Sequence, residues 1–364
     1  MMDRLKNLNK TSRANLITYA MVIIAYVVMQ TLASMHAISS SMIGLLVPIS
    51  AYICLSISLN LVVGISGELS LGHAGFMSVG AFTGLVAAHV LGPLVASNAL
   101  RLLLSMVVAG CFAALAGVLV GIPVMRLQGD YLAIVTLAFG EIIKNLLNNL
   151  YVGYDGALHF SMKDTASLGM QGGKVLINGP QGAVGIEKLS TFTAGFLLVL
   201  FTLFVVTNLV NSRSGRAIMA VRDNRIAAES VGIDTTKYRL MAFVVAAALA
   251  GMAGALYAMN FSSIVPKKFD FNTSILILVF VVLGGMGNIR GGIIAAALLT
   301  ILPEKLRFIG DFRMLIYAVV LISVMLFSNN ATVRMAIQRL RERFTRKDDD
   351  AALADDVKGG GANV

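Results

Sequence analysis

Charged side chains are scarce in this sequence. Asp, Glu, Lys and Arg together make up 13% of the 364 residues, whereas hydrophobic residues make up 57%. A soluble domain carries about 25% charged residues, so this composition excludes an ordinary water-soluble protein. Apolar runs of roughly 20 residues recur along the chain, and each is long enough to cross a bilayer as a helix. The sequence therefore predicts an all-α, polytopic bundle of transmembrane helices.

Cysteine is also rare, and the two residues of this type, Cys54 and Cys111, lie inside apolar runs. We expect them to be packing residues rather than a disulfide or a metal site. The sequence has no Walker A pattern, no nucleophile with a neighbouring base and no zinc-ligand spacing. These absences exclude a P-loop ATPase and argue against an enzyme with its own cofactor.

Acidic residues are outnumbered by basic ones, which gives a net charge of +10. The basic residues gather in the N-terminal tail, in one central loop and in the C-terminal tail, as in the cytoplasmic parts of membrane proteins. This distribution indicates orientation in a membrane and not nucleic-acid binding. We expect a cytoplasmic tail at 1–15, a membrane-embedded domain at 16–330 and a second cytoplasmic tail at 331–364.

Seven apolar runs come before residue 261. They are expected to be spans, at 16–35, 43–63, 71–90, 102–122, 131–150, 192–209 and 240–260. Counting from a cytoplasmic N-terminus places the polar segment 151–191 outside the cell and the basic segment 211–239 inside. Span count and charge distribution therefore agree on the side that the basic segment occupies.

The next apolar stretch, Ser274–Pro303, is interrupted in its middle by GGMGNIRGG. Each arm holds about 12–13 residues, or roughly 19 Å of helix, which is short of a hydrocarbon core of about 30 Å. If this stretch were one broken span, the last span at 314–328 would deliver the basic C-terminal tail outside. A hairpin of two arms, either re-entrant or fully crossing, keeps that tail inside. We therefore expect about ten helical segments with glycine-broken half-helices.

The basic loop Ser212–Arg239 is a long polar interruption in the second half of the chain. Its middle predicts a short helix, which Asp223 or Asn224 can cap and Gly232 can end in the left-handed conformation. A helix of about eight residues is marginal alone in water, so we expect it to dock on another surface. The alternative interpretation is an ordinary positive-inside loop with one helical turn.

The segment GRAIMAVRDNRIAAESVGID, at 215–234, resembles the cytoplasmic coupling loop of branched-chain amino acid ABC-transporter permeases of the LivM type. The strings SGELSLGHAGFMSVGA, YLAIVTLAFGEIIKN and VVLGGMGNIRGG resemble further segments of that family. The family loop follows a Glu-Ala-Ala…Gly pattern, whereas this chain has a different order of the same residue types. The resemblance implies that the short helix sits in a groove of a separate ATPase subunit. It makes eight residues candidates for coupling: Arg216, Arg222, Asp223, Arg225, Ala227, Ala228, Glu229 and Gly232.

The resemblance also implies an assembly in the bacterial cytoplasmic membrane, with both termini of this chain in the cytoplasm. The implied partners are a second, homologous permease subunit, two ABC ATPase subunits, an extracytoplasmic solute-binding protein and membrane lipids. ATP and Mg²⁺ would be bound by the ATPase subunits, so no cofactor is expected in this chain. The implied solute is leucine, isoleucine or valine, moved by alternating access, while urea or a short amide is an alternative carried by related permeases.

Glycine interrupts apolar sequence at matching places in the two halves of the chain, Gly64–Phe76 and Leu283–Gly292. Broken helices at corresponding positions mark transport sites in many carriers, because freed backbone groups are tolerated at membrane depth only beside protein or water. The alternative interpretation is that the glycines allow close helix packing and that His73 is a hydrogen-bonded packing residue. The candidate pathway residues here are Gly67, Glu68, Ser70, Gly72, His73, Gly284, Gly285 and Gly287.

Glu141 and Lys144 lie three residues apart in the predicted span 131–150, so they share a helix face and can pair. An ionisable group at mid-bilayer costs roughly 2.5–3.5 kcal/mol, which makes both residues pathway candidates. The pair either orients two helices or meets a zwitterionic amino acid. Two other hypotheses for the whole chain stay open: an ion-coupled secondary carrier that uses this pair and Glu68, and a membrane scaffold or sensor.

Overall fold

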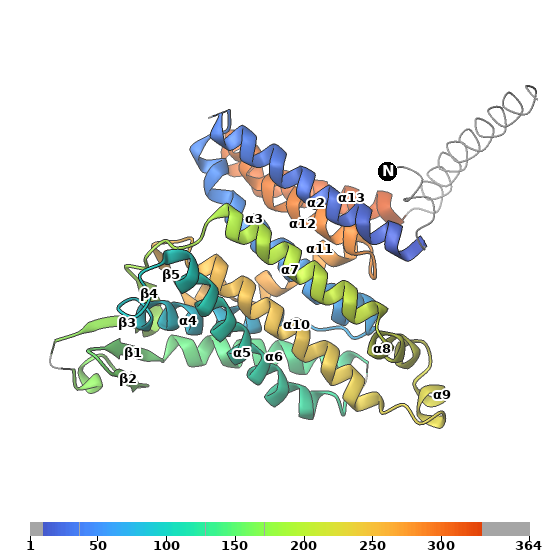
Figure 1. The fold of residues 1–364 in the computed structure, drawn as a ribbon, viewed down its shortest axis with the longest axis horizontal. Helices are drawn as coiled ribbons and strands as arrows, with labels where there is room; N and C mark the ends of the chain where they lie inside the picture. The colour runs from blue at the N-terminus through green and yellow to red at the C-terminus, as the bar shows by residue number, and fades with distance from the viewer. Residues whose placement is uncertain (1–9, 36, 128, 171, 330–364) are drawn as a thin grey trace, which may run out of the picture. The chain divides into compact units, whose positions relative to one another are not determined.

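The structure is a computed structural model that describes residues 10–35, 37–127, 129–170 and 172–329. Most of the two predicted tails falls on residues 1–9 and 330–364, which lie outside the described residues. The chain divides into two compact units, with the boundary between Glu304 and Lys305. Figure 1 follows the elements along the chain by colour and label.

Helices make up most of the described chain, which confirms the helical class expected from the sequence. In chain order they are α2 (Lys10–Ser34), α3 (Ser40–Asn60), α4 (His73–Val90), α5 (Asn98–Val124), α6 (Asp130–Asn148), α7 (Phe192–Asn211), α8 (Arg213–Asp223), α9 (Arg225–Ser230), α10 (Thr235–Ala258), α11 (Phe271–Gly284), α12 (Ile289–Lys305) and α13 (Arg313–Asn329). A π-helical turn, η1 (Leu61–Ile65), continues α3 without a break.

Seven helical stretches of the described chain are long and apolar enough to cross a membrane, and they correspond to the first seven predicted spans. They are α2, α3 with η1, α4, α5, α6, α7 and α10. The remaining apolar helices are shorter: α11 has 14 residues, and α12 and α13 have 17 each. At a rise of about 1.5 Å per residue, these three helices are about 21–26 Å long.

The predicted two-armed hairpin is confirmed by α11 and α12. The chain leaves α11 at Gly284 and enters α12 at Ile289, so four residues connect the arms. Gly285 and Gly287 adopt φ values of 88° and 81°, in the left-handed region that favours glycine. The glycine-rich string therefore makes a tight turn between two separate helices.

In the larger unit, α10 packs closely against α4 and α5 (Figure 1). A Cβ atom on Gly80 would clash with the backbone of Gly251, and one on Gly254 would clash with the carbonyl oxygen of Met77. Small residues let helix backbones approach this closely where lipid provides no hydrophobic drive for association. Aromatic rings fill the neighbouring space, since Phe76 and Phe243 meet edge to face at 5.4 Å.

The polar segment 151–191 contains strands that the sequence analysis did not predict. Strand β1 (Tyr151–Tyr154) pairs antiparallel with β2 (Leu158–Ser161) and with β3 (Lys174–Asn178), and β4 (Ala183–Val184) pairs with β5 (Ser263–Ile264). These strands have two to five residues and lie among polar and glycine residues, so they are too short to show a clear alternation. The pair β4–β5 ties the segment to the chain that follows α10.

Candidate functional site

The basic loop between α7 and α10 folds as the two short helices α8 and α9. The side chain of Asn224 caps α9 by accepting a hydrogen bond from the backbone N–H of Ala227 at 3.0 Å. Gly232 follows the helix with φ of 84°, in the left-handed region. The short helix predicted from the sequence is confirmed, and Asn224 rather than Asp223 provides its cap.

Two large apolar side chains of this loop are directed away from the protein. Ile226 is 81% exposed and Val231 is 75% exposed, whereas Ala228 between them is buried. Neither side chain belonged to the predicted coupling residues. Their signal in the sequence was weak but present, because they are branched apolar residues in a segment otherwise rich in charge. Such exposed apolar groups on a helix are typical of a surface that a partner covers.

Glu229 holds α9 against the start of α10. One oxygen of its carboxylate accepts hydrogen bonds from the Nε of Arg225 at 2.9 Å and from the hydroxyl of Thr235 at 2.8 Å. Both bonds lower the pKa of Glu229 below its usual value, and the bond from Arg225 has the larger effect. The ionised carboxylate therefore fixes the orientation of α9 at neutral pH.

Arg222 connects the end of α8 with the first glycine-broken segment. Its Nη1 donates to the carbonyl oxygen of Gly64 at 3.2 Å, and its Nε and Nη2 donate to Asp223 at 3.0 and 2.8 Å. A Cβ atom on Gly67 would clash with the aliphatic stem of this arginine. The structure therefore brings three predicted residues from two separate parts of the sequence into one contact.

The two glycine-broken segments lie against each other. The backbone N–H of Gly287 donates to the side-chain oxygen of Asn60 at 2.8 Å, and a Cβ atom on Gly64 would clash with the nitrogen of Gly287. Beyond the turn, the hydroxyl of Ser56 donates to the carbonyl oxygen of Gly292 at 3.1 Å. Arg222, Gly64 and Gly287 therefore form a continuous contact from the basic loop to the hairpin of α11 and α12.

The other predicted glycines of these segments serve close packing or the hairpin turn. A Cβ atom on Gly284 would clash with the backbone of Gly291 across the hairpin, and one on Gly72 would clash with the carbonyl oxygen of Thr136 on α6. Gly285 supports the turn through its positive φ. These positions fit the packing interpretation that the sequence analysis kept open.

Glu68 forms a buried ion pair with Arg239 of α10, and each side chain is 8% exposed. The Nη1 of Arg239 also donates to the carbonyl oxygen of Met125 at the end of α5, at 2.9 Å. The sequence analysis did not assign Arg239 to the site, because 171 residues separate it from Glu68. This one arginine joins the first glycine-broken segment to α5 and α10.

Several polar atoms around the first glycine-broken segment are buried without a hydrogen-bond partner among the described residues. They include Oε2 of Glu68 and the hydroxyls of Ser66 and Ser70. His73, by contrast, has a partner, since its Nε2 lies 2.8 Å from the hydroxyl of Ser58. This contact fits the packing role that the sequence analysis gave as the alternative for His73.

Glu141 and Lys144 pair with each other on α6, as the sequence predicted. Within the described residues, the hydrogen bonds and ion pairs of both side chains are confined to this pair. They therefore make no polar contact with the cluster around Glu68. Arg216 is also separate from that cluster, since its Nη1 donates to the carbonyl oxygen of Asn211 at 3.3 Å.

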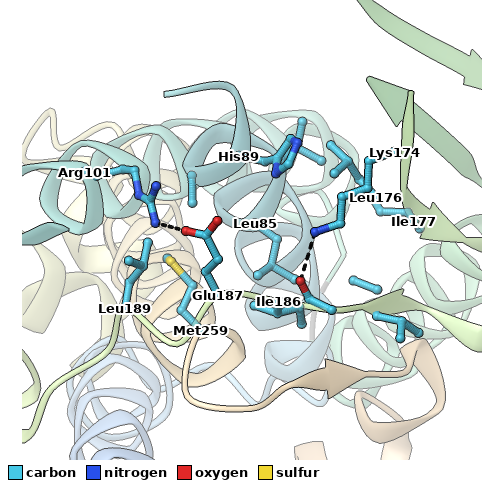
Figure 2. A pocket seen from close by; sticks show the side chains of 15 residues that line it. Leu85, His89, Arg101, Lys174, Leu176, Ile177, Ile186, Glu187, Leu189 and Met259 are labelled. Atoms are coloured by element: carbon cyan, nitrogen blue, oxygen red, sulfur yellow. Dashed lines mark hydrogen bonds and ion pairs between the residues drawn. The ribbon is translucent and has the colours of Figure 1, made fainter. Parts of the chain in front are cut away.

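A small cavity lies where the sheet segment meets α4 and α5, and Figure 2 shows its lining. Arg101 of α5 pairs with the carboxylate of Glu187, and Lys174 donates to the carbonyl oxygen of Gly185 at 3.1 Å. The cavity has a volume of about 40 Å³, which is little more than the share of one water molecule. It is too small for a solute, and the ion pair of Arg101 and Glu187 fastens the segment 174–187 to α5.

Comparison with known proteins places these features in one family. The family model described as "Branched-chain amino acid transport system / permease component" matches residues 41–328, which include both glycine-broken segments and the basic loop. No solved structure matches the chain significantly.

Three curated proteins are similar to this chain. Two are named "High-affinity branched-chain amino acid transport system permease protein LivM", from Salmonella typhimurium and from Escherichia coli, and each is 37% identical over 238 residues. Each of these alignments covers 62% of this chain and 54% of the relative, so this chain spans about half of their length. The third is named "Probable branched-chain amino acid transport permease protein LivM", from Methanocaldococcus jannaschii, and is 26% identical over 247 residues, or 60% of this chain and 67% of the relative.

Proposed function

Because this chain belongs to the family of permease components of branched-chain amino acid transport systems, we propose that it is one membrane subunit of an ABC importer for leucine, isoleucine or valine. A second, homologous permease subunit completes the membrane part, and two separate ATPase subunits bind ATP and Mg²⁺. An extracytoplasmic solute-binding protein delivers the solute, which crosses the bacterial cytoplasmic membrane by alternating access.

The observation that carries this proposal is the contact of Arg222 with Gly64 and Gly67. The exposed apolar side chains of Ile226 and Val231 give α9 a surface for an ATPase subunit. Movement of α9 passes through α8 to Arg222, because Asn224 alone separates the two helices. Arg222 then transmits this movement to the first glycine-broken segment and, through it, to the hairpin of α11 and α12.

The proposed orientation places the basic loop in the cytoplasm. Six alternating spans, α2 to α7, from a cytoplasmic N-terminus bring α8 and α9 to the inner side. The same alternation puts the segment 151–191, with strands β1 to β4, on the outer side, where the solute-binding protein docks. With α11, α12 and α13 as three further crossings, the C-terminal tail at 331–364 is cytoplasmic.

The proposed translocation pathway follows α6. Much of this span is left uncovered within the chain, and it carries the ion pair of Glu141 and Lys144 at half-buried positions. A charged pair on an uncovered membrane helix is stable only beside water or protein. We therefore assign this face of α6 to the water-filled path and to the second permease subunit.

Reconstitution with the ATPase subunits and the solute-binding protein tests the proposal. ATP-dependent uptake of leucine into proteoliposomes is the expected result, and uptake that needs a proton gradient but no ATP contradicts it. The variant Ile226→Asp places a charge on the docking surface and is expected to reduce co-purification of the ATPase about tenfold or more, as loss of an interface hot spot does. The matched control is Phe160→Asp, an apolar-to-acidic change at a side chain of β2 that is 63% exposed. Equal loss of ATPase from both variants contradicts the assigned surface.

A further inference from the structure

A larger cavity opens beside the basic loop, between α8, α9, α10 and the first glycine-broken segment. Its volume is about 370 Å³, which lies in the range of about 300–1,000 Å³ that is typical of small-molecule sites. Three arginines and a single glutamate provide its charged lining: Arg222, Arg225, Arg239 and Glu68. Each arginine pairs with a carboxylate, Arg222 with Asp223, Arg225 with Glu229 and Arg239 with Glu68, so a ligand carboxylate depends on guanidinium nitrogens that these pairs leave free.

Arg225 is the arginine that is available for that carboxylate. Arg239 is engaged with Glu68 and with a backbone carbonyl, and Arg222 is engaged with Gly64 and with the carboxylate of Asp223. Among the described residues, the hydrogen bond of Arg225 runs from its Nε to Glu229 and leaves both terminal Nη groups without a partner. A guanidinium group with free Nη atoms matches the geometry of a carboxylate.

Glu68 offers the opposite charge on the same cavity. One of its oxygens accepts from Arg239, but Oε2 is buried and accepts no hydrogen bond from any described residue. The hydroxyl of Ser66, another lining residue, is also buried and has no hydrogen-bond partner among the described residues. A buried acceptor without a donor is destabilising, and a ligand ammonium group brings hydrogen-bond donors.

Apolar side chains complete the lining. Leu132 of α6 and Val221 of α8 are 2% and 6% exposed, and Leu69 of the glycine-broken segment is 39% exposed. Such a surface suits an aliphatic group of a few carbon atoms. The cavity therefore combines an acceptor for an ammonium group, a donor for a carboxylate and an apolar wall.

We propose that this cavity binds a free α-amino acid with an aliphatic side chain, its carboxylate on Arg225 and its ammonium group on Glu68 and Ser66. The proposal rests on the proposed function, because it gives the transported solute a second site on the cytoplasmic, exit side. Amino acid that accumulates in the cytoplasm occupies this site and holds Arg225, Glu68 and the neighbouring α8 in place. Occupancy from the inside therefore slows further import.

The test measures binding of radiolabelled leucine to the assembled complex in lipid nanodiscs, without ATP and without the solute-binding protein. Saturable binding is expected, and Arg225→Gln and Glu68→Gln are each expected to weaken it at least about tenfold. Arg225 lies on the partly exposed α9, so its variant gives a result even if loss of the buried Glu68 charge prevents folding. The matched control is Arg126→Gln, an exposed arginine that does not line the cavity.

Competitors identify the chemistry that the cavity recognises. Leucinamide lacks the carboxylate and 4-methylpentanoate lacks the ammonium group, so each is expected to compete at least about tenfold less well than leucine. If 4-methylpentanoate or inorganic phosphate competes as well as leucine, the cavity is an anion site and the proposal is overturned. It is also overturned if wild-type binding is not saturable, or if Arg225→Gln and Glu68→Gln bind leucine normally. ATP-driven uptake by the same purified complex in proteoliposomes separates these results from a failure of the proposed function, which loss of wild-type uptake would indicate.

Discussion

At the scale of single residues, the most constrained group is the buried pair of Glu68 and Arg239. Both charges have left water, and their mutual attraction together with the bond to Met125 offsets part of the desolvation cost. Removing one charge leaves the other buried and unpaired, whereas replacing both by apolar groups removes the desolvation cost as well. The pair therefore gives the first glycine-broken segment a fixed position against α10.

The variant Arg239→Met is expected to lower the free energy of unfolding by about 3–5 kcal/mol, the usual cost of breaking a buried pair. The double variant Glu68→Leu with Arg239→Met is expected to recover most of this loss, because no isolated charge remains. Thermal unfolding of the purified chain in detergent measures both effects. If the double variant is less stable than Arg239→Met alone, the loss of stability does not come from an unpaired buried charge, and this explanation is contradicted.

At the scale of elements, α8 and α9 are short helices whose positions depend on a few side chains. Arg222 secures the end of α8 to the first glycine-broken segment, and Glu229 secures α9 to the start of α10. Helices of 11 and 6 residues have little stability alone. The orientation of both helices, and with it the proposed path of coupling, therefore depends on these two residues.

The variant Arg222→Ala is expected to leave the ATPase subunits bound while uptake of leucine per ATP hydrolysed falls about tenfold, a typical coupling between two sites. The reason is that the apolar surface of α9 stays intact but its link to Gly64 and Gly67 is lost. Uptake and phosphate release are measured together in proteoliposomes. The control is Arg213→Ala, an exposed position at the start of α8, and an equal loss of coupling in this control contradicts the assigned path.

Acid is expected to loosen α9 through Glu229. The pKa of this carboxyl is lowered in the folded protein by the hydrogen bonds from Arg225 and Thr235. Its contribution to stability is therefore complete above the pKa of an unfolded glutamate and is lost as the pH falls through the lowered value. A spin label at Val231→Cys, in a chain with Cys54→Ala and Cys111→Ala, reports the mobility of the helix end. Glu229→Gln is expected to make that mobility independent of pH over this range. If the mobility of this variant depends on pH as it does in the chain with Glu229, the assignment is contradicted.

At the scale of the whole molecule, the alternation of spans determines which groups meet the cytoplasm. Single cysteines introduced at Ser167, in the sheet segment, and at Thr236, at the start of α10, test this order in the same cysteine-free background. Both positions are exposed. An impermeant maleimide added to intact cells is expected to label position 167 and to label position 236 only after the membrane is opened. The reverse pattern contradicts the orientation of the basic loop and with it the site of ATPase docking.

Local chemistry explains which parts of this molecule could be predicted from the sequence. Asn224 and Gly232 specify a short helix by capping, and the glycine pair in GGMGNIRGG specifies a turn, so both features were found. The contact of Arg222 with Gly64 joins residues 158 apart, and no local pattern encodes such a distance. The strands were missed for another reason. Pairing between such short polar segments depends on tertiary contacts that bring the segments together, and no local sequence pattern encodes these contacts.

One consequence follows from α10 being a single uninterrupted helix. Its 24 residues form a rod of about 36 Å, gripped near one end by Glu229 at Thr235 and by Glu68 at Arg239. Beyond its other end, four residues lead to β5, whose pairing with β4 reaches the sheet segment. A tilt imposed on either end moves the other end as well. In the proposed assembly, α10 therefore links docking of the solute-binding protein on one side of the membrane to nucleotide binding by the ATPase on the other.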